Sequence, residues 1–233
     1  MTALEEIIEL NASISESILS TLVYHKNNEL RKRARIAQIH LSQHDPFKFF
    51  SEEFDKDFTA WDKIKIHDIL LKKPLKTIPN FARWIPVIKN EKLQCLFIYE
   101  IGHYKQIENR HFLFDYFKKT TNDMVKIECL KTLEILGISE FKTKFLHIYP
   151  LCSEEVQLHL TLALKKVAND PETLKFFIKA FDKTYETNLK IALGKAIYNS
   201  GPVGKKAISV IEKNAEGFDL LVFEHVKNPL LEI

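Results

Sequence analysis

"NDMVKIECLKTLEILG", residues 122–137, has the spacing of an amphipathic helix. Apolar Val125 is followed by polar Lys126 and then by small or apolar residues four, five and eight positions later. The pattern recurs at seven anchors, 31–33 positions apart: Leu30, Trp61, Leu93, Val125, Val156, Leu189 and Leu221. Leu30 fits least well, because Arg35 and Gln38 occupy two of its follower positions. The sequence therefore predicts one helix, called here the first helix, in every repeat of about 32 residues.

A second helical segment follows each of the first six of these helices. The six candidates are "PFKFFSEEF" (46–54), "PNFARWIPVI" (79–88), "NRHFLFDYFKK" (109–119), "SEFKTKFLHIY" (139–149), "PETLKFFIKAF" (171–181) and "GKKAISVIEK" (204–213). Pro86 is expected to shorten or kink the second of them. Paired helices at a fixed period predict an all-α fold, an α-solenoid of about six to seven helix pairs that share one core. Small residues such as Ala34, Cys129 and Gly194 would let neighbouring helices approach closely.

The composition agrees with an all-α protein. Of the 233 residues 45% are hydrophobic and 28% are charged, while glycine is scarce at 6 residues and phenylalanine abundant at 17. The net charge of +3 and the lack of a polycationic arm argue against nucleic acid as a partner. Three separate cysteines predict reduced thiols and no disulfide framework. With neither a signal peptide nor an apolar run long enough to span a membrane, we expect a cytoplasmic location.

The stretch "NELRKRARIAQIHL", residues 28–41, resembles a HEAT repeat. It has the apolar–arginine pair Leu30–Arg31, followed by Ala34 and Ala37. This resemblance covers nearly the whole chain and implies a fold but no activity. It implies one solenoid over 1–233: a partial repeat 1–27, repeats that begin near 28, 59, 90, 122, 153 and 186, and a C-terminal helix 218–227.

A narrower resemblance is to bacterial HEAT-repeat proteins of unknown function that have an N-terminal membrane helix and are often encoded beside a glycosyltransferase. The stretches that prompt it are "FTAWDKIKIHDILLKKP" (58–74), "PNFARWI" (79–85) and "GHYKQ" (102–106). It implies a protein–protein interaction scaffold for a membrane-associated enzyme complex. This chain lacks the membrane helix, so membrane contact would need a segment absent from it and would place it on the cytoplasmic face.

The first residues match the end of a repeat. Residues 3–10 fit the tail of a first helix and residues 14–25 fit its second helix. This predicts that the natural protein continues upstream of Met1. A native capping helix is the alternative.

No motif predicts a cofactor, a metal site or catalysis. His40 and His44 have the spacing of two metal ligands on one helix, with Asp45 adjacent, but no third ligand can be placed. "SGPVGKK", residues 200–206, departs from the phosphate-loop pattern and is interpreted as the turn between paired helices. No Ser–His–Asp or Cys–His arrangement can be argued from spacing, so we expect a non-catalytic protein.

Two other functions stay open. DNA-alkylation-repair glycosylases include HEAT-like solenoids with a Trp/Asp constellation, which Trp61, Asp62, Asp68 and Trp84 resemble. Because Trp61 occupies an anchor position, we expect it to pack in the core instead. A regulatory subunit that senses a small molecule is the third hypothesis, and it predicts a buried polar pocket between repeats.

The predicted contact surface for a protein partner lies on the second helices, which we expect to line a concave face. Trp84 and Tyr116 would be binding hot spots if they faced solvent. The candidate partner-binding residues are Arg83, His111, Asp115, Lys118, Lys175, Lys179, Lys205 and Lys206.

Overall fold

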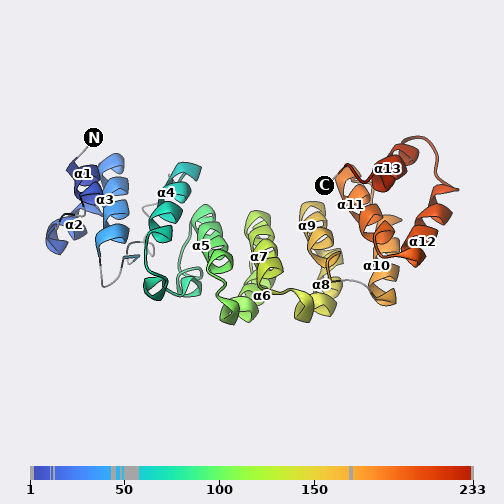
Figure 1. Cartoon of the computed structure of the whole chain (residues 1–233), viewed down its shortest axis with the longest axis horizontal. Coiled ribbons are helices and arrows are strands. Elements are labelled where there is room, and N and C mark those ends of the chain that lie inside the picture. The colour runs from blue at the N-terminus through green and yellow to red at the C-terminus, as the bar shows by residue number, and fades with distance from the viewer. Residues whose placement is uncertain are drawn as a thin grey trace. The chain divides into compact units, whose positions relative to one another are not determined.

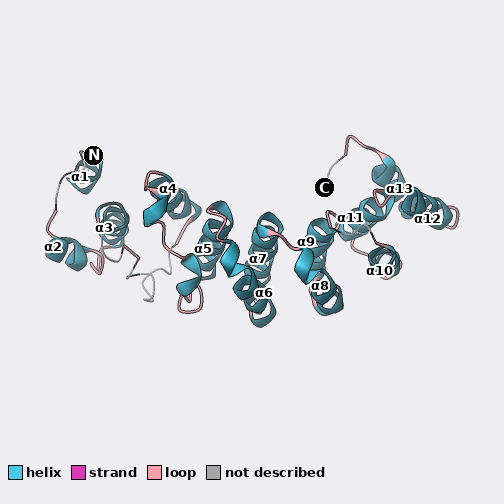
Figure 2. Cartoon of the chain, turned by 60° about the horizontal axis from the view of Figure 1, so that its bottom comes forward, coloured by secondary structure: helices cyan, strands magenta, loops and turns pink. Residues whose placement is uncertain are grey.

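A computed structural model describes residues 3–10, 12, 14–42, 46–47, 49, 58–167 and 170–231 (Figure 1). Over these residues the chain forms helices, turns and loops, and no strand (Figure 2). The all-α prediction is therefore confirmed for the described part of the chain. The helices form two compact units, Met1–Gln106 and Ile107–Ile233, and each has its own core.

The first unit contains five α-helices within its described ranges. They are α1 (Ala3–Glu9), α2 (Glu16–Leu22), α3 (Asn28–Leu41), α4 (Ala60–Leu71) and α5 (Glu91–His103), with short 3₁₀ turns η3 (Leu75–Thr77) and η4 (Phe81–Arg83). Helix α3 packs against α1, α2 and α4, and α4 packs against α5. The aromatic core joins Phe47, Trp84 and Phe97, with the ring centroids of Phe47 and Trp84 4.9 Å apart. Trp84 is thus a core residue and offers no exposed hot spot.

The second unit contains eight α-helices among its described residues. They are α6 (Arg110–Lys119), α7 (Asp123–Leu136), α8 (Lys142–Ile148), α9 (Glu154–Leu164), α10 (Pro171–Phe181), α11 (Thr187–Tyr198), α12 (Pro202–Glu212) and α13 (Phe218–Lys227), with 3₁₀ turns η5 (Ile107–Asn109), η6 (Ser139–Phe141) and η7 (Tyr149–Leu151). Helix α9 packs between α7 and α11, and α11 also packs against α13 (Figure 1). Phe114, Phe117, Phe141 and Phe145 form an aromatic cluster in its core.

The predicted first helices are present as α3, α4, α5, α7, α9, α11 and α13. In five of them the third residue is the predicted anchor, and its backbone N–H donates to the N-cap side chain. The N-cap and anchor pairs are Asn27–Leu30, Asn90–Leu93, Asn122–Val125, Ser153–Val156 and Glu186–Leu189. The repeat therefore begins with a capped helix, which satisfies backbone donors that the helix itself cannot pair.

Helix α4 departs from the predicted register by one residue. Its N-cap Thr59 accepts from the backbone N–H of Asp62, so Asp62 and not Trp61 is the third residue of the helix. Trp61 consequently lies one position early and has 62% of its surface exposed. The expectation that Trp61 packs in the core is wrong, because a shift of one residue turns a helical side chain by about 100°.

The polar residue after each anchor has a structural role in at least three repeats. Arg31 Nη1 donates to the carbonyl of His25 at 2.9 Å, and Gln94 Nε2 donates to the carbonyl of Ile88 at 2.5 Å. Gln157 Nε2 donates to the carbonyls of Tyr149 and Cys152 at 3.1 and 3.0 Å. Each side chain thus ties a first helix to the backbone of the segment that precedes it.

The second helices are confirmed more fully in the second unit than in the first. Segments 109–119, 139–149 and 171–181 contain α6, α8 and α10, and segment 204–213 covers all of α12 except its first two residues. Segment 79–88 forms only the turn η4 and non-helical backbone, in agreement with the expected effect of Pro86. Most of segment 46–54 lies outside the described residues.

Two glycines are required by geometry. A Cβ on Gly194 would lie 2.5 Å from Cγ2 of Val226, so glycine permits the close approach of α11 and α13. Gly201 has φ 87° and precedes Pro202, the first residue of α12. The turn between the paired helices therefore ends at Gly201, as predicted, and residues 202–206 already belong to α12. Among the described helices, none has the length and apolar character to cross a lipid bilayer.

Candidate functional site

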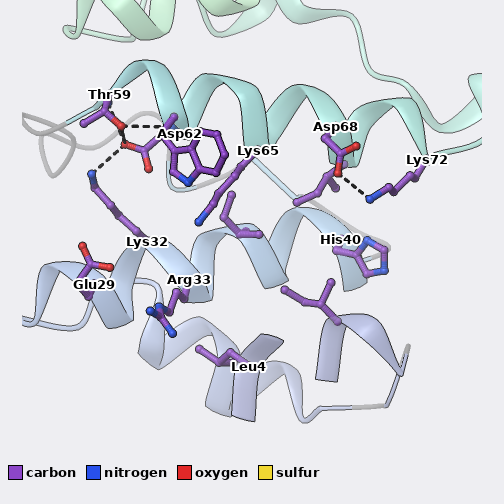
Figure 3. A pocket seen from close by; sticks show the side chains of 14 residues that line it. Leu4, Glu29, Lys32, Arg33, His40, Thr59, Asp62, Lys65, Asp68 and Lys72 are labelled. Atoms are coloured by element: carbon purple, nitrogen blue, oxygen red, sulfur yellow. Dashed lines mark hydrogen bonds and ion pairs between the residues drawn. The ribbon is translucent and has the colours of Figure 1, made fainter. Parts of the chain in front are cut away.

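A groove of about 790 Å³ lies between α1, α3 and α4 of the first unit and is called here the α3–α4 groove (Figure 3). Helix α1 contributes Leu4 and Ile8. The residues from α3 are Glu29, Lys32, Arg33, Ile36 and His40. The remaining wall consists of the N-cap Thr59 and residues Trp61, Asp62, Lys65, Asp68, Ile69 and Lys72 along α4. The groove thus combines segments about 60 residues apart in the sequence.

The groove has an apolar interior and an exposed aromatic residue. Leu4 and Ile69 are buried, and Ile36 is half-buried. Trp61 is mostly exposed, and Lys65 Nζ lies 5.8 Å from the centroid of its ring. A large aromatic side chain that lies over an apolar recess is a typical anchor point for a binding partner.

Hydrogen bonds fix the side chain of Asp62 in the wall of the α3–α4 groove. Its Oδ2 accepts from Lys32 Nζ at 2.8 Å and from the Thr59 backbone N–H and hydroxyl at 2.9 and 2.8 Å (Figure 3). Burial opposes ionisation, but the hydrogen bonds from Lys32 and Thr59 outweigh it and hold the pKa of Asp62 below its ordinary value. Asp62 is therefore ionised at neutral pH, and it closes the capping box of α4.

The far end of the groove contains His40 and a second ion pair. Lys72 Nζ lies 2.6 Å from Asp68 Oδ2, one helical turn away. Burial, followed by the nearby charges of Lys73 and Lys72, lowers the pKa of His40, so its imidazole is neutral at pH 7. Its proposed companions as metal ligands, His44 and Asp45, lie outside the described residues. Within the described ranges no three His, Cys, Asp or Glu side chains are grouped to hold a metal ion.

The eight predicted partner-binding residues are all exposed, but none lines the α3–α4 groove. Arg83 belongs to the first unit and stacks on Trp84, with its Cζ 3.7 Å from the ring centroid. The other seven lie on α6, α10 and α12 of the second unit: His111, Asp115, Lys118, Lys175, Lys179, Lys205 and Lys206. Asp115 pairs with Lys118 at 2.7 Å. Their role in binding stays a prediction, and Tyr116 beside them is half-buried.

Sequence reasoning missed most of the groove. It placed Trp61 in the core and did not single out Lys65, Ile36 or Leu4. One signal was available, because Thr59 and Asp62 are spaced as a capping box and so fix the start of α4. That start places Trp61 at the second helical position, outside the buried stripe.

A second polar cluster in the first unit surrounds the fully buried Glu100. Its Oε1 lies 2.9 Å from His67 Nδ1, and Oε2 has no hydrogen-bond partner among the described residues. Burial raises the pKa of Glu100, although His67 opposes the change. The His103 ring lies 4.8 Å from that of His67, and burial lowers the pKa of His103. This cluster joins α4 to α5 and extends from the buried Glu100 through the half-buried His67 to the exposed His103.

The cysteines offer no reactive pair. Cys95 and Cys129 are buried and Cys152 is half-buried, and all three are free thiols. Burial raises the pKa of Cys152, which keeps it protonated at neutral pH.

No protein-family model, curated protein or solved structure matches this chain. The fold and the site by themselves define its class. It is an all-helical protein with a capped helical repeat and a groove that combines apolar, aromatic and charged side chains.

Proposed function

We propose that this chain is a non-catalytic protein–protein interaction scaffold, and that the α3–α4 groove binds an amphipathic helix of its partner. The observation that carries the proposal is the groove itself, with Trp61 62% exposed beside an apolar interior. Helices commonly bind such grooves through apolar side chains one turn apart. The partner helix would cover Trp61 and place its apolar stripe against Ile36 and Ile69.

The charged side chains of the groove indicate which charge the partner helix should have beside its apolar stripe. Lys32, Arg33, Lys65 and Lys72 face three carboxylates, from Glu29, Asp62 and Asp68, which leaves one excess positive charge. Two of the lysines are paired with Asp62 and Asp68, whereas Lys65 extends along the exposed ring of Trp61. A partner helix with a carboxylate beside its apolar stripe matches this arrangement.

We further propose that the helices form a HEAT-like α-solenoid of about six to seven pairs. The recurring N-caps and the packing of successive first helices within each unit support it. Small-angle X-ray scattering tests the shape. A solenoid predicts a radius of gyration well above the roughly 17 Å of a compact chain of this length. A value near 17 Å would rule the solenoid out.

The resemblance to membrane-anchored HEAT-repeat proteins suggests an enzyme complex at the cytoplasmic face of a membrane, such as one with a glycosyltransferase, as the source of the partner. Affinity purification from solubilised membranes, with mass spectrometry, identifies the retained protein. Trp61→Ala is expected to abolish its retention, since loss of a central aromatic contact costs about 2 kcal/mol or more. Tyr185→Ala is the matched control, because Tyr185 is 92% exposed and lies outside the groove. Equal retention by both variants would refute the groove as the site.

The alternative is a DNA-binding protein related to DNA-alkylation-repair glycosylases. The exposure of Trp61 beside Asp62 favours it, since an exposed indole can stack on a base. The three hydrogen bonds that Asp62 already accepts argue against it as a catalytic base. Binding to duplex DNA that weakens steeply with salt and is lost in Trp61→Ala would select this alternative over the scaffold.

A further inference from the structure

A second recess lies in the other unit, between α7 and α9. It has a volume of about 300 Å³ and is called here the α7–α9 recess. Lys131 and Glu134 of α7 line one side, and His159 of α9 lines the other. Lys165 and Lys166 follow at the end of α9. Two adjacent first helices therefore enclose a small, mainly basic hollow.

This recess occupies the same face of the repeat as the α3–α4 groove. Four lining residues of α9 and its C-terminal end come three, six, seven and ten positions after the third residue of the helix, Val156: His159, Leu162, Ala163 and Lys166. In α4 the same spacing after Asp62 gives four residues of the groove: Lys65, Asp68, Ile69 and Lys72. The recess is thus a feature of the repeat, and its chemistry depends on the side chains at four positions.

The charges in the recess favour an anion. Three lysines face one carboxylate, and Lys166 pairs with that carboxylate, Glu134. Lys131 and Lys165 have no ion-pair partner within the described residues. A bound anion would give these two cations a partner.

The pKa of His159 reflects the charges that line the α7–α9 recess. Burial, followed by the charge of Lys131, lowers the pKa of His159, while Glu155 and Glu134 act in the opposite direction. The imidazole is therefore neutral at pH 7, in part because the Lys131 charge disfavours its protonation. An anion in the recess would favour its protonated form and add a third donor.

We propose that the α7–α9 recess binds a small phosphate-bearing molecule whose phosphate contacts Lys131, His159 and Lys165. The dianionic charge of a phosphate monoester suits two lysines and an imidazolium. Leu130 and Leu162 would contact the organic part of the ligand. The site does not depend on the α3–α4 groove, and the scaffold could use it to sense a metabolite.

The test is an NMR titration of the histidines in the full chain with glycerol phosphate. Binding is expected to raise the pKa of His159 in a saturable way. Sodium chloride at matched ionic strength and glycerol alone are expected to leave it unchanged. A shift that chloride reproduces, or the absence of saturation, would overturn the proposal.

Substitution of single lysines tests whether glycerol phosphate binds in the α7–α9 recess. Lys131→Gln and Lys165→Gln are each expected to weaken the affinity for glycerol phosphate by about two- to fivefold, as for a solvent-exposed ion pair. Lys206→Gln is the control, because Lys206 is exposed on α12 and outside the recess. Lys131 and Lys206 are exposed and Lys165 is half-buried, and glutamine keeps most of the lysine stem, so the variants should remain folded. Equal affinity in all four proteins would also overturn the proposal.

Discussion

At the scale of single residues, hydrogen bonds from side chains to the backbone stabilise the repeat. Gln157 donates to two carbonyls of the segment before α9, those of Cys152 and Tyr149, and the Tyr149 carbonyl also accepts from the backbone N–H of Cys152. Leaving a buried acceptor without a donor costs more free energy than an average hydrogen bond contributes, because the group has also lost its contact with water. A polar residue after the anchor is therefore a structural requirement in these repeats.

Gln157→Ala tests this role. We expect it to lower the free energy of unfolding by about 1–3 kcal/mol, because the Cys152 carbonyl loses its donor and the Tyr149 carbonyl loses one of its two. Urea denaturation followed by circular dichroism measures the change. Glu155→Ala on the same helix is the control, since Glu155 is exposed, and should change stability by less than about 0.5 kcal/mol. Equal stability of both variants would contradict the assigned role.

Glu100 makes stability depend on pH. Because its pKa is raised by burial, the folded state retains the proton of Glu100 at pH values where the unfolded state has released it. The folded state then binds more protons, so this group's contribution to stability falls as pH rises above about 4.5, the ordinary value. Glu100→Gln should remove that loss.

The expected result is that stability relative to the parent protein increases in Glu100→Gln as pH rises from about 5 to about 8. Urea denaturation at several pH values measures it. Glu91→Gln, at an exposed position of the same helix, serves as the control. A difference that is constant with pH would show that Glu100 ionises equally in both states.

At the scale of elements, the sequence predicted the first helices because their periodicity reflects one buried stripe per helix. Val125, Cys129, Leu130 and Leu133 are all buried, as the pattern requires. The prediction from periodicity was wrong by one residue at α4, where it took Trp61 as the anchor in place of the third residue, Asp62. Apolar character alone does not distinguish a buried from an exposed side chain, whereas the cap at Thr59 does.

The contact between α11 and α13 gives a prediction in which packing opposes helix propensity. Alanine is a better helix former than glycine by about 1 kcal/mol. Gly194→Ala should nevertheless destabilise the protein by about 1–3 kcal/mol, because its Cβ would lie 2.5 Å from Val226. Thermal denaturation measures the effect. Val226→Ala removes the clashing methyl groups, so the double variant should lose less stability than the sum of the two single changes. Additive losses would contradict the proposed clash.

At the scale of the whole molecule, the two compact units predict separable folding. Unit Ile107–Ile233 has its own aromatic core, including Phe114, Phe117, Phe141 and Phe145. We expect this segment alone to be helical and to unfold cooperatively, which circular dichroism and urea denaturation measure. A broad transition without a baseline would show that its core depends on the rest of the chain.

The candidate site was less predictable than the fold for a physical reason. Periodicity reports which side of one helix is buried, but the α3–α4 groove needs Leu4, Ile36 and Ile69 from three different helices. Its shape depends on how those helices pack, which no local pattern specifies. The α7–α9 recess is similar, because Lys131 and His159 are 28 positions apart and belong to two repeats.

The hydrogen bonds that Gln157 donates also affect how the protein would respond to force. They fasten α9 to the turn Tyr149–Leu151 and to Cys152, so these segments form one block. If the chain were stretched from its ends, that block would resist shear, and α9 would detach together with the turn before it. Under tension the helices would then separate at the residues before the turns, and not at the starts of the helices. Each repeat would therefore extend in a discrete step.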